Sequence, residues 1–230
     1  MTEQERQIII SKAKEFFRER IAAKHLQNTV KLSDVNEFTI NPFIHKYLAQ
    51  FAFGNSTPES MAKVLLYPRV LGTSISTTFG TQMQYFCSEV LTSYASVVSG
   101  IDIEFIDATD NRKKYCQIKA GPNTINKDDV KTIKDHFKGI ESLARTNHLD
   151  VRMSDCVVGV FYGTAQELSG NYKKINESYP VFVGADFWKR LTGEPTFYNE
   201  LINAFVEVAG EMNSQELLDR VISQLSESFK

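Results

Sequence analysis

The segment that most constrains the fold of this chain is a β-hairpin that we expect between residues 100 and 121. The first strand, residues 101–107, alternates apolar and polar side chains, and the second, residues 113–119, ends in Gln-Ile-Lys. The turn between them, Ala-Thr-Asp-Asn-Arg at 108–112, contains the polar residues that bring two strands together. The chain must therefore build a sheet, and its helices must pack around that sheet.

The polar side chains of this hairpin are expected to meet near its open end. Successive side chains of a strand point to opposite faces, so Asp102 and Glu104 share one face of the first strand. By the same rule Gln117 and Lys119 share one face of the second strand, together with Tyr115. An acid, an amide oxygen and an ammonium that converge can hold a divalent cation against a phosphodiester. This pattern favours a nuclease.

Helices are expected on both sides of the hairpin in the sequence. Thr2 with Glu5 fits a capping box, and Asn41 and Thr57 each precede a proline, as an N-cap does. The helix that starts after Thr57 should end before Pro68, because the residue before a proline avoids the α region. Further helices are expected over residues 81–97, 127–143, 186–191, 196–212 and from 214 onward, and further strands over 156–162 and 180–183.

Strands that alternate with helices favour an α/β fold in which helices flank a central sheet. No repeat or low-complexity linker interrupts the sequence, so we expect a single domain over residues 1–230. Within it, residues 1–97 should be mostly helical, 98–184 should form the sheet core with the site, and 185–230 should form C-terminal helices.

Composition narrows the class of protein. The net charge of −2 argues against a chain that coats a polyanion, but it permits a local basic cleft. The three cysteines are scattered and lack the spacing of a zinc site, and no apolar run approaches the roughly 20 residues of a membrane span. The sequence also begins without the order of a signal peptide. We expect a protein of a reducing compartment, the prokaryotic cytoplasm, with no membrane partner.

The hairpin and the segments around it resemble a known group of enzymes. Asp102, the Gln-Ile-Lys run at 117–119, the helix after it and two apolar strands resemble the PD-(D/E)xK nuclease core. Six fragments in order resemble type II restriction endonucleases that cut GGNCC or GGWCC sites: residues 40–43, 68–72, 101–102, 118–121, 157–163 and 183–188. The resemblance implies a restriction-endonuclease-like core with a mixed central sheet and helical termini. It also implies Mg²⁺-dependent cuts in double-stranded DNA, a homodimer, and a cognate DNA methyltransferase as a functional partner.

The resemblance assigns catalysis to Asp102, Gln117 and Lys119, with Asp102 and Gln117 as metal ligands. Two positions depart from the motif: Ile101 replaces its proline, and Gln117 replaces its second acid. An amide oxygen can bind a hard cation but brings no charge. Glu104 or Glu89 could restore the missing carboxylate, and the sequence leaves open which of them does.

Contacts to DNA are expected beside the second strand. Polar side chains of the loop at 122–127 and a stripe of lysines on the next helix are the candidates, and an arginine of the first third is another: Asn123, Thr124, Asn126, Lys127, Lys131, Lys134 and Arg69. The alternatives are structural, since Asn126 suits an N-cap and lysine stripes are often solvated. The four histidines lack zinc or triad spacing, and we expect most of them on the surface.

Three other functions stay open at this point. A repair or modification-dependent nuclease of the same fold is one, because some of these enzymes also carry Gln-x-Lys. A DNA-binding module with a degraded nuclease site is another, in which Gln117 marks the loss. The third is an unrelated α/β enzyme whose hairpin is only structural. A retained Lys119 and an acidic first strand favour an active nuclease over the inactive module.

Overall fold

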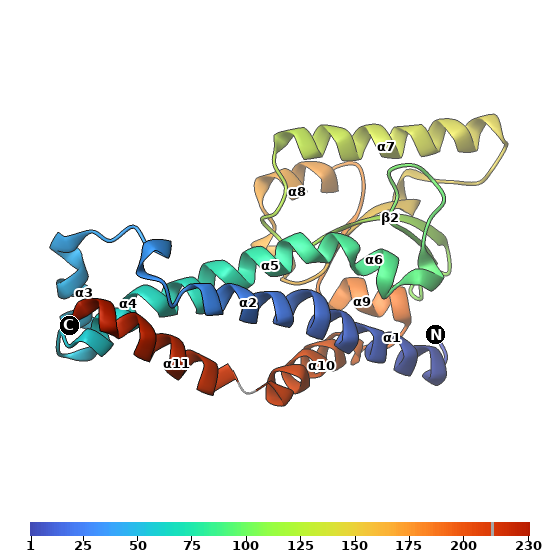
Figure 1. Ribbon diagram of the computed structural model, residues 1–230. Coiled ribbons are helices and arrows are strands. Elements are labelled where there is room, and N and C mark those ends of the chain that lie inside the picture. Colours follow the sequence, from blue (N-terminus) through green and yellow to red (C-terminus); the bar gives the residue numbers. More distant parts are fainter. Residues whose placement is uncertain (213) are drawn as a thin grey trace. The chain divides into compact units, whose positions relative to one another are not determined.

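The computed structural model describes residues 1–212 and 214–230, which divide into two compact units (Figure 1). The first unit comprises Met1–Lys14 and Met83–Ala204, and the second comprises Glu15–Gln82 and Phe205–Lys230. Two helices, α1 (Glu3–Phe16) and α10 (Phe197–Glu211), contribute residues to both units. The sheet that the sequence predicts lies in the first unit.

A mixed sheet of four strands forms the centre of the first unit. The strands are β1 (Ile103–Ile106), β2 (Lys113–Lys119), β3 (Cys156–Val160) and β4 (Val181–Val183), and they lie in the order β1-β2-β3-β4. The β1–β2 pair is antiparallel, whereas β3 is parallel to both β2 and β4. This arrangement confirms the predicted α/β fold with a mixed central sheet flanked by helices.

The predicted hairpin is confirmed, with a turn built from its own polar residues. Asp107 Oδ1 accepts a hydrogen bond from the N–H of Thr109 (2.8 Å), and Asp110 Oδ1 accepts one from the N–H of Arg112 (3.0 Å). Asn111 takes a positive φ of 56°, which asparagine tolerates better than most residues. The register pairs Glu104 with Tyr115, so the predicted polar faces do lie on the same side of the hairpin.

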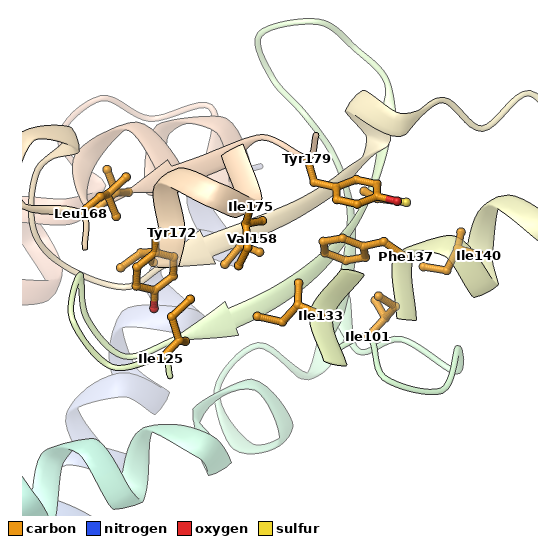
Figure 2. Close-up of a cluster of buried hydrophobic side chains, with 13 residues drawn as sticks. Ile101, Ile125, Ile133, Phe137, Ile140, Val158, Leu168, Tyr172, Ile175 and Tyr179 are labelled. Carbon is orange, nitrogen blue, oxygen red and sulfur yellow. The ribbon is translucent and has the colours of Figure 1, made fainter. Parts of the chain in front are cut away.

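Two helices cover one face of the sheet (Figure 1), and Tyr115, which shares a face of β2 with Gln117 and Lys119, packs on that side. The two helices are α7 (Lys127–Thr146) and α8 (Gly170–Asn176). Side chains from both helices and from β3 form a buried cluster that includes Ile133, Phe137, Val158 and Ile175 (Figure 2). Each large apolar side chain that is fully buried contributes about 1.5–3 kcal/mol. This cluster therefore fixes α7 against the face of the candidate site.

Aromatic packing closes the opposite face of the sheet. Trp188 of α9 (Ala185–Thr192) is fully buried, and its indole N–H donates to the carbonyl of Phe161 (3.0 Å). Its ring packs edge-on against Phe161 and against Phe86 of α6 (Phe86–Glu89). Both faces of β3 are thus covered, as its continuous apolar sequence predicts.

The second unit is helical. Its helices are α2 (Ala23–Lys31), α3 (Pro42–Phe53), α4 (Pro58–Pro68), α5 (Ile75–Gln82) and α11 (Ser214–Ser226), and π-helical turns span Phe17–Ala22 and Arg69–Ser74. Short 3₁₀ turns in the two units span Val35–Glu37, Met83–Tyr85, Thr92–Tyr94, Met153–Asp155, Ala165–Glu167 and Glu227–Phe229. A buried cluster from α2, α4 and α11 forms the core of this unit.

The predicted helix starts are confirmed by their caps. The Thr2 hydroxyl accepts from the N–H of Glu5 (3.2 Å), and the Glu5 carboxylate accepts from the N–H of Thr2 (2.7 Å). Asn41 accepts from the N–H of Phe43 at 3.0 Å, and Thr57 accepts from the N–H of Ser60 at 3.4 Å.

The prediction that a helix ends before Pro68 is wrong. Helix α4 includes Pro68 and continues through the π-helical turn Arg69–Ser74 into α5. A proline has no N–H to donate, so one helical hydrogen bond is lost there. The buried side chains of Leu66 and Val70 on either side of the proline pack into the core of the second unit and hold the chain helical.

The continuous helix predicted over residues 81–97 is also wrong. The segment breaks into the end of α5, a 3₁₀ turn, the short helix α6 and a second 3₁₀ turn. The end of the segment pairs with the sheet instead: Ala95 forms an antiparallel bridge with Ile103, and the N–H of Ser96 donates to the carbonyl of Asp102 (3.2 Å). This backbone pairing replaces the hydrogen bonds of a continued helix. Within the described residues, none of the helices combines the length and apolar character needed to traverse a bilayer.

Candidate functional site

The structure gathers the three principal site residues around one pocket at the open end of the hairpin. Asp102 immediately precedes β1, while Gln117 and Lys119 lie near the end of β2. The pocket has a volume of about 240 Å³, and its lining combines hairpin and α7 residues: Gly100, Ile101, Asp102, Gln117, Lys119, Asp129, Thr132, Ile133 and His136. The convergence of an acid, an amide and an ammonium is the arrangement that strand alternation predicts.

Asp102 is fixed by the backbone of both strands. Its N–H donates to the carbonyl of Cys116 (3.0 Å), and its Oδ2 accepts from the N–H of Ile118 (2.6 Å). Burial raises the pKa of Asp102, although the hydrogen bond from Ile118 and the positive charge of Lys119 act in the opposite direction. The residue as a whole remains exposed to solvent at the mouth of the pocket. Burial disfavours the charged form of Asp102, and a bound cation would favour that form.

Lys119 supplies the positive charge of the pocket. Its side chain is half-buried, and within the described part of the chain its ammonium forms no hydrogen bond or ion pair. An ammonium has three donors. In this pocket all three are available to a water molecule or to the oxygens of a phosphate.

Gln117 is buried, with 5% of its surface exposed, and its amide nitrogen is fully used. Nε2 donates to the carbonyl of Gly100 and lies 2.7 Å from Nδ1 of His136. The amide oxygen Oε1 has no hydrogen-bond donor within the described residues. The oxygen is therefore the end of the amide that is available to a ligand in the pocket.

Helix α7 contributes residues that the sequence reading missed. Asp129, Thr132 and His136 recur at spacings of three and four, so they line the pocket along one face of this helix. Asp129 also closes the capping box, because its Oδ2 accepts from the N–H of Asn126 (2.8 Å). The helical spacing alone could have grouped these three residues. Only the packing of α7 over β2 shows that they face the site.

The two alternative acids lie away from this pocket. Glu104 accepts from the hydroxyl of Ser96 (2.6 Å) and pairs with the ammonium of Lys113 (2.6 Å). Burial alone would raise the pKa of Glu104, but the hydrogen bonds from Lys113 and Ser96 leave it lowered. Glu89 ends helix α6 and is not among the residues that line the pocket. Across the described residues, no group of three or more His, Cys, Asp or Glu side chains is placed to hold a metal.

The loop before α7 has a structural role at each end. Asn126 is the N-cap of α7, and its Oδ1 accepts from the N–H groups of Asp128 (2.7 Å) and Asp129 (3.0 Å). The hydroxyl of Thr124 donates to the carbonyl of Gly121 (2.8 Å). Asn123, which precedes Thr124, is exposed and remains available for contact.

The lysines of α7 lie on the side of the helix away from its core. Lys127 and Lys131 are exposed and Lys134 is half-buried, whereas the buried residues of α7 pack into the core cluster. Acidic residues interrupt the basic stripe, and Lys138 lies 3.9 Å from Asp135. Arg69 belongs to the second unit, where its guanidinium lies 5.9 Å from the ring centroid of Phe38.

A match to a family model over most of the chain shows that this fold is that of a type II restriction endonuclease, a site-specific nuclease that acts on double-stranded DNA. The family model described as type II restriction endonuclease EcoO109I matches residues 3–213 of the chain. The chain therefore belongs to the EcoO109I family of type II restriction endonucleases. A search of curated proteins returned no match. Type II restriction endonucleases generally use divalent metal ions.

Proposed function

We propose that the pocket of Asp102, Gln117 and Lys119 makes Mg²⁺-dependent double-strand cuts in DNA at a short palindromic G/C-rich site of the GGWCC or GGNCC type. The observation that carries this proposal is the meeting of three side chains with unused binding capacity in one pocket. Among the residues that the structure describes, Lys119 has no protein partner there and the amide oxygen of Gln117 has no donor. The target sequence rests on the six resembling fragments.

The donor set of the pocket fits Mg²⁺. This ion prefers oxygen ligands, keeps several of its waters, and is usually bound by one or two carboxylates together with substrate phosphates. The carboxylate of Asp102 and the amide oxygen of Gln117 would be its protein ligands. When bound, the ion would polarise the scissile phosphate and lower the pKa of the attacking water.

The side chains themselves would divide the remaining work. Asp102 is held by the N–H of Ile118, so its carboxylate keeps one orientation as DNA enters. The free ammonium of Lys119 would orient the attacking water and offset the charge that builds on the phosphate. Enzymes accelerate reactions by typically 10⁶–10¹⁷-fold, with still larger factors for the slowest hydrolyses, which explains why these charged groups must share one pocket.

A digest of unmethylated phage DNA tests the proposed reaction. With Mg²⁺ the protein should produce discrete fragments, and a chelator should abolish them. Sequencing of the fragment ends then reads the site directly. A smear would indicate a nonspecific or repair nuclease, and a gel shift without cutting would indicate an inactive binding module. Either result contradicts the proposal.

We also propose that the enzyme acts as a homodimer, because a palindrome presents the same half-site to each of two subunits. An apolar face on α3 supports this. Phe43, Tyr47 and Phe51 follow one another at four-residue spacing and are 92%, 62% and 76% exposed. An aromatic side chain buries about 150–250 Å², so this face alone offers an apolar patch of the size that marks interaction surfaces.

Light scattering of the protein and of a double variant tests the dimer. The wild-type chain should have the mass of two subunits at micromolar concentration, and Phe43→Glu with Phe51→Glu should give a folded monomer. The control is Ile202→Glu, which places the same charge on an exposed apolar residue of a different helix, α10. A wild-type monomer, also when bound to DNA, would contradict the homodimer. We also propose that a cognate DNA methyltransferase is the functional partner of the enzyme and that the enzyme acts in the prokaryotic cytoplasm. The three free cysteines agree with a reducing compartment.

A further inference from the structure

His136 lies in the pocket but has no place in the proposed reaction, and its contacts suggest a separate role. Its Nδ1 is 2.7 Å from Nε2 of Gln117, and its ring packs against Gly100. A Cβ on Gly100 would overlap the imidazole, and Gly100 has a φ of +78°. A glycine is therefore required for the ring to occupy this position.

An amide ligand creates a problem that a carboxylate ligand does not have. The two oxygens of a glutamate are equivalent, so either one can face a cation. A glutamine presents an oxygen at one end and two N–H donors at the other. If the amide of Gln117 turned over, it would present donors to the cation. The departure of this chain from an acid at residue 117 thus requires a group that holds the amide one way.

The surroundings of Gln117 meet this requirement. The carbonyl of Gly100 can only accept, so it must face Nε2 rather than Oε1. His136 Nδ1 is the second neighbour of the same nitrogen, and it accepts the other N–H when the imidazole is neutral and protonated on Nε2. Both donors of the amide are then satisfied, and Oε1 is left for the pocket.

The helix that carries His136 is suited to fix this geometry. The capping box of Asn126 secures the start of α7. Ile133 and Phe137, on either side of His136 in the sequence, are 1% and 0% exposed in the core cluster. A ring held between a buried helix face and Gly100 has little freedom to move. Groups that orient a ligand are effective when their own positions are fixed.

We propose that His136 is a positioning residue that holds the amide of Gln117 with its oxygen toward the cation pocket. This inference rests on the proposed function, because it assumes that Gln117 is a metal ligand. It predicts a conditional effect: loss of His136 should matter while residue 117 is glutamine and should cease to matter when it is glutamate.

The test is a cycle of Mn²⁺ affinities, measured with the metal alone by paramagnetic resonance of the free ion. His136→Ala should weaken Mn²⁺ binding by about tenfold, the lower end of the range for partners of metal ligands. In a chain that already carries Gln117→Glu, the same change should have less than a twofold effect. Thr146→Ala is the control, since the Thr146 hydroxyl donates to the carbonyl of Ser142 (3.0 Å) within the same helix, as Thr132 does to Asp128, but Thr146 does not line the pocket.

A second variant and a spectroscopic measurement guard against misfolding. His136→Gln offers an acceptor oxygen at similar reach, so it should keep most of the affinity. In the wild-type protein, nitrogen NMR should show His136 protonated on Nε2 with Nδ1 accepting a hydrogen bond. A proton on Nδ1 would overturn the role of His136 without any variant.

The outcomes separate this inference from the proposed function. If Asp102→Ala and Gln117→Ala weaken Mn²⁺ binding while His136→Ala does not, only the positioning role is wrong. An equal loss from His136→Ala with glutamine and with glutamate at residue 117 also overturns it, because the histidine would then act independently of the amide. If neither Asp102→Ala nor Gln117→Ala changes the affinity, the proposed metal site is wrong and the role of His136 is wrong with it.

Discussion

Two lysines on the same strand, Lys114 and Lys119, differ in almost every respect that matters. Lys114 is 1% exposed, and its ammonium donates to Asp110 (2.6 Å), to Asp155 (3.1 Å) and to the carbonyl of Ser154 (3.2 Å). Lys119 is half-buried, and within the described part of the chain it has no such partner. The ammonium near the start of β2 is therefore fully paired, whereas the ammonium at the end of β2 is unpaired within the described residues.

The end of β2 at Lys114, which we call the saturated end, is a network in which every charged group named here has protein partners. Asp155 is 1% exposed and also accepts from Nη2 of Arg112 (2.5 Å) and from the N–H of Arg152 (3.0 Å). Burial alone would raise the pKa of Asp155, but the hydrogen bonds from Arg112, Arg152 and Lys114 lower it to about 2. A buried charge whose partners are all present has no binding capacity left for a substrate.

Lys114 and Lys119 show how a functional site can be told from a structural ion pair. Lysines and acids occur at both ends of the hairpin, so residue type alone does not separate structure from function. The separating property is unused donor or acceptor capacity in a pocket, which Lys119 and Gln117 have and Lys114 lacks. We expect substitutions at the open end to remove activity and substitutions at the saturated end to remove stability.

The largest expected effect is on cleavage by Asp102→Ala. Loss of this carboxylate removes the only charged ligand of the proposed cation, and we expect cleavage to fall by about 1,000-fold or more. Stability should change by less than about 1 kcal/mol, because burial raises the pKa of Asp102 and its charge is not strongly stabilised. Cleavage rates and urea unfolding of the purified variant check both statements. Near-normal cleavage would remove Asp102 from the reaction.

The next largest effect is the loss of stability from Lys114→Ala. This change leaves the buried carboxylate of Asp155 without one partner, and broken buried pairs cost about 3–5 kcal/mol. Lys113→Ala is the matched control, because Lys113 is the residue before Lys114 and its side chain is 53% exposed. The pair of Lys113 with Glu104 should contribute less than about 1 kcal/mol. Denaturant unfolding measures the difference. Equal stability in the two variants would contradict the structural role of Lys114.

The saturated end should also make stability depend on pH through Asp155. Its pKa is lowered from 3.8 to about 2, so its contribution is present above pH 3.8 and is lost as the pH falls toward 2. Asp155→Asn should therefore lower the melting temperature near neutral pH by an amount that shrinks below pH 4. The control is Asp150→Asn, because Asp150 pairs with the same arginine but is 73% exposed. If the difference in melting temperature between the wild-type protein and Asp155→Asn stayed constant with pH, Asp155 would not be the source of the pH dependence.

The smallest effect concerns DNA contacts of α7. Charge reversal at Lys131 or at Lys134 should each reduce the slope of log affinity against log salt by about 1 and leave sequence preference unchanged. Lys230→Glu is the control, because this C-terminal lysine already pairs with Glu227 (2.5 Å). Filter binding across a salt series gives the slopes. Slopes equal to that of the wild-type protein would show that these lysines of α7 do not contact DNA phosphates.

The sequence predicts those features that depend on local rules. Turn residues and strand alternation predict the hairpin and the shared face of Gln117 and Lys119, and the cap motifs predict the helix starts. The family match supports the predicted class of enzyme.

Features that depend on tertiary packing could not be predicted in the same way. The helix continues through Pro68 because buried neighbours on both sides hold it, which no local rule contains. His136 faces Gln117 because Ile133 and Phe137 set the rotation of α7 over the sheet. The pairing of Glu104 with Lys113 likewise depends on the register across the hairpin. The roles of the site residues, and a single domain over the whole chain, stay predictions.

The most direct measurement is single-turnover cleavage of one DNA by two variants, Lys119→Ala and Lys114→Ala, at a temperature at which both are folded. The rate should fall by at least about 100-fold for Lys119→Ala and should stay within about threefold of wild type for Lys114→Ala. Unfolding measured on the same samples should show the reverse order of stability. If Lys119→Ala cleaved DNA at the wild-type rate, the open end of the hairpin would not be the catalytic site.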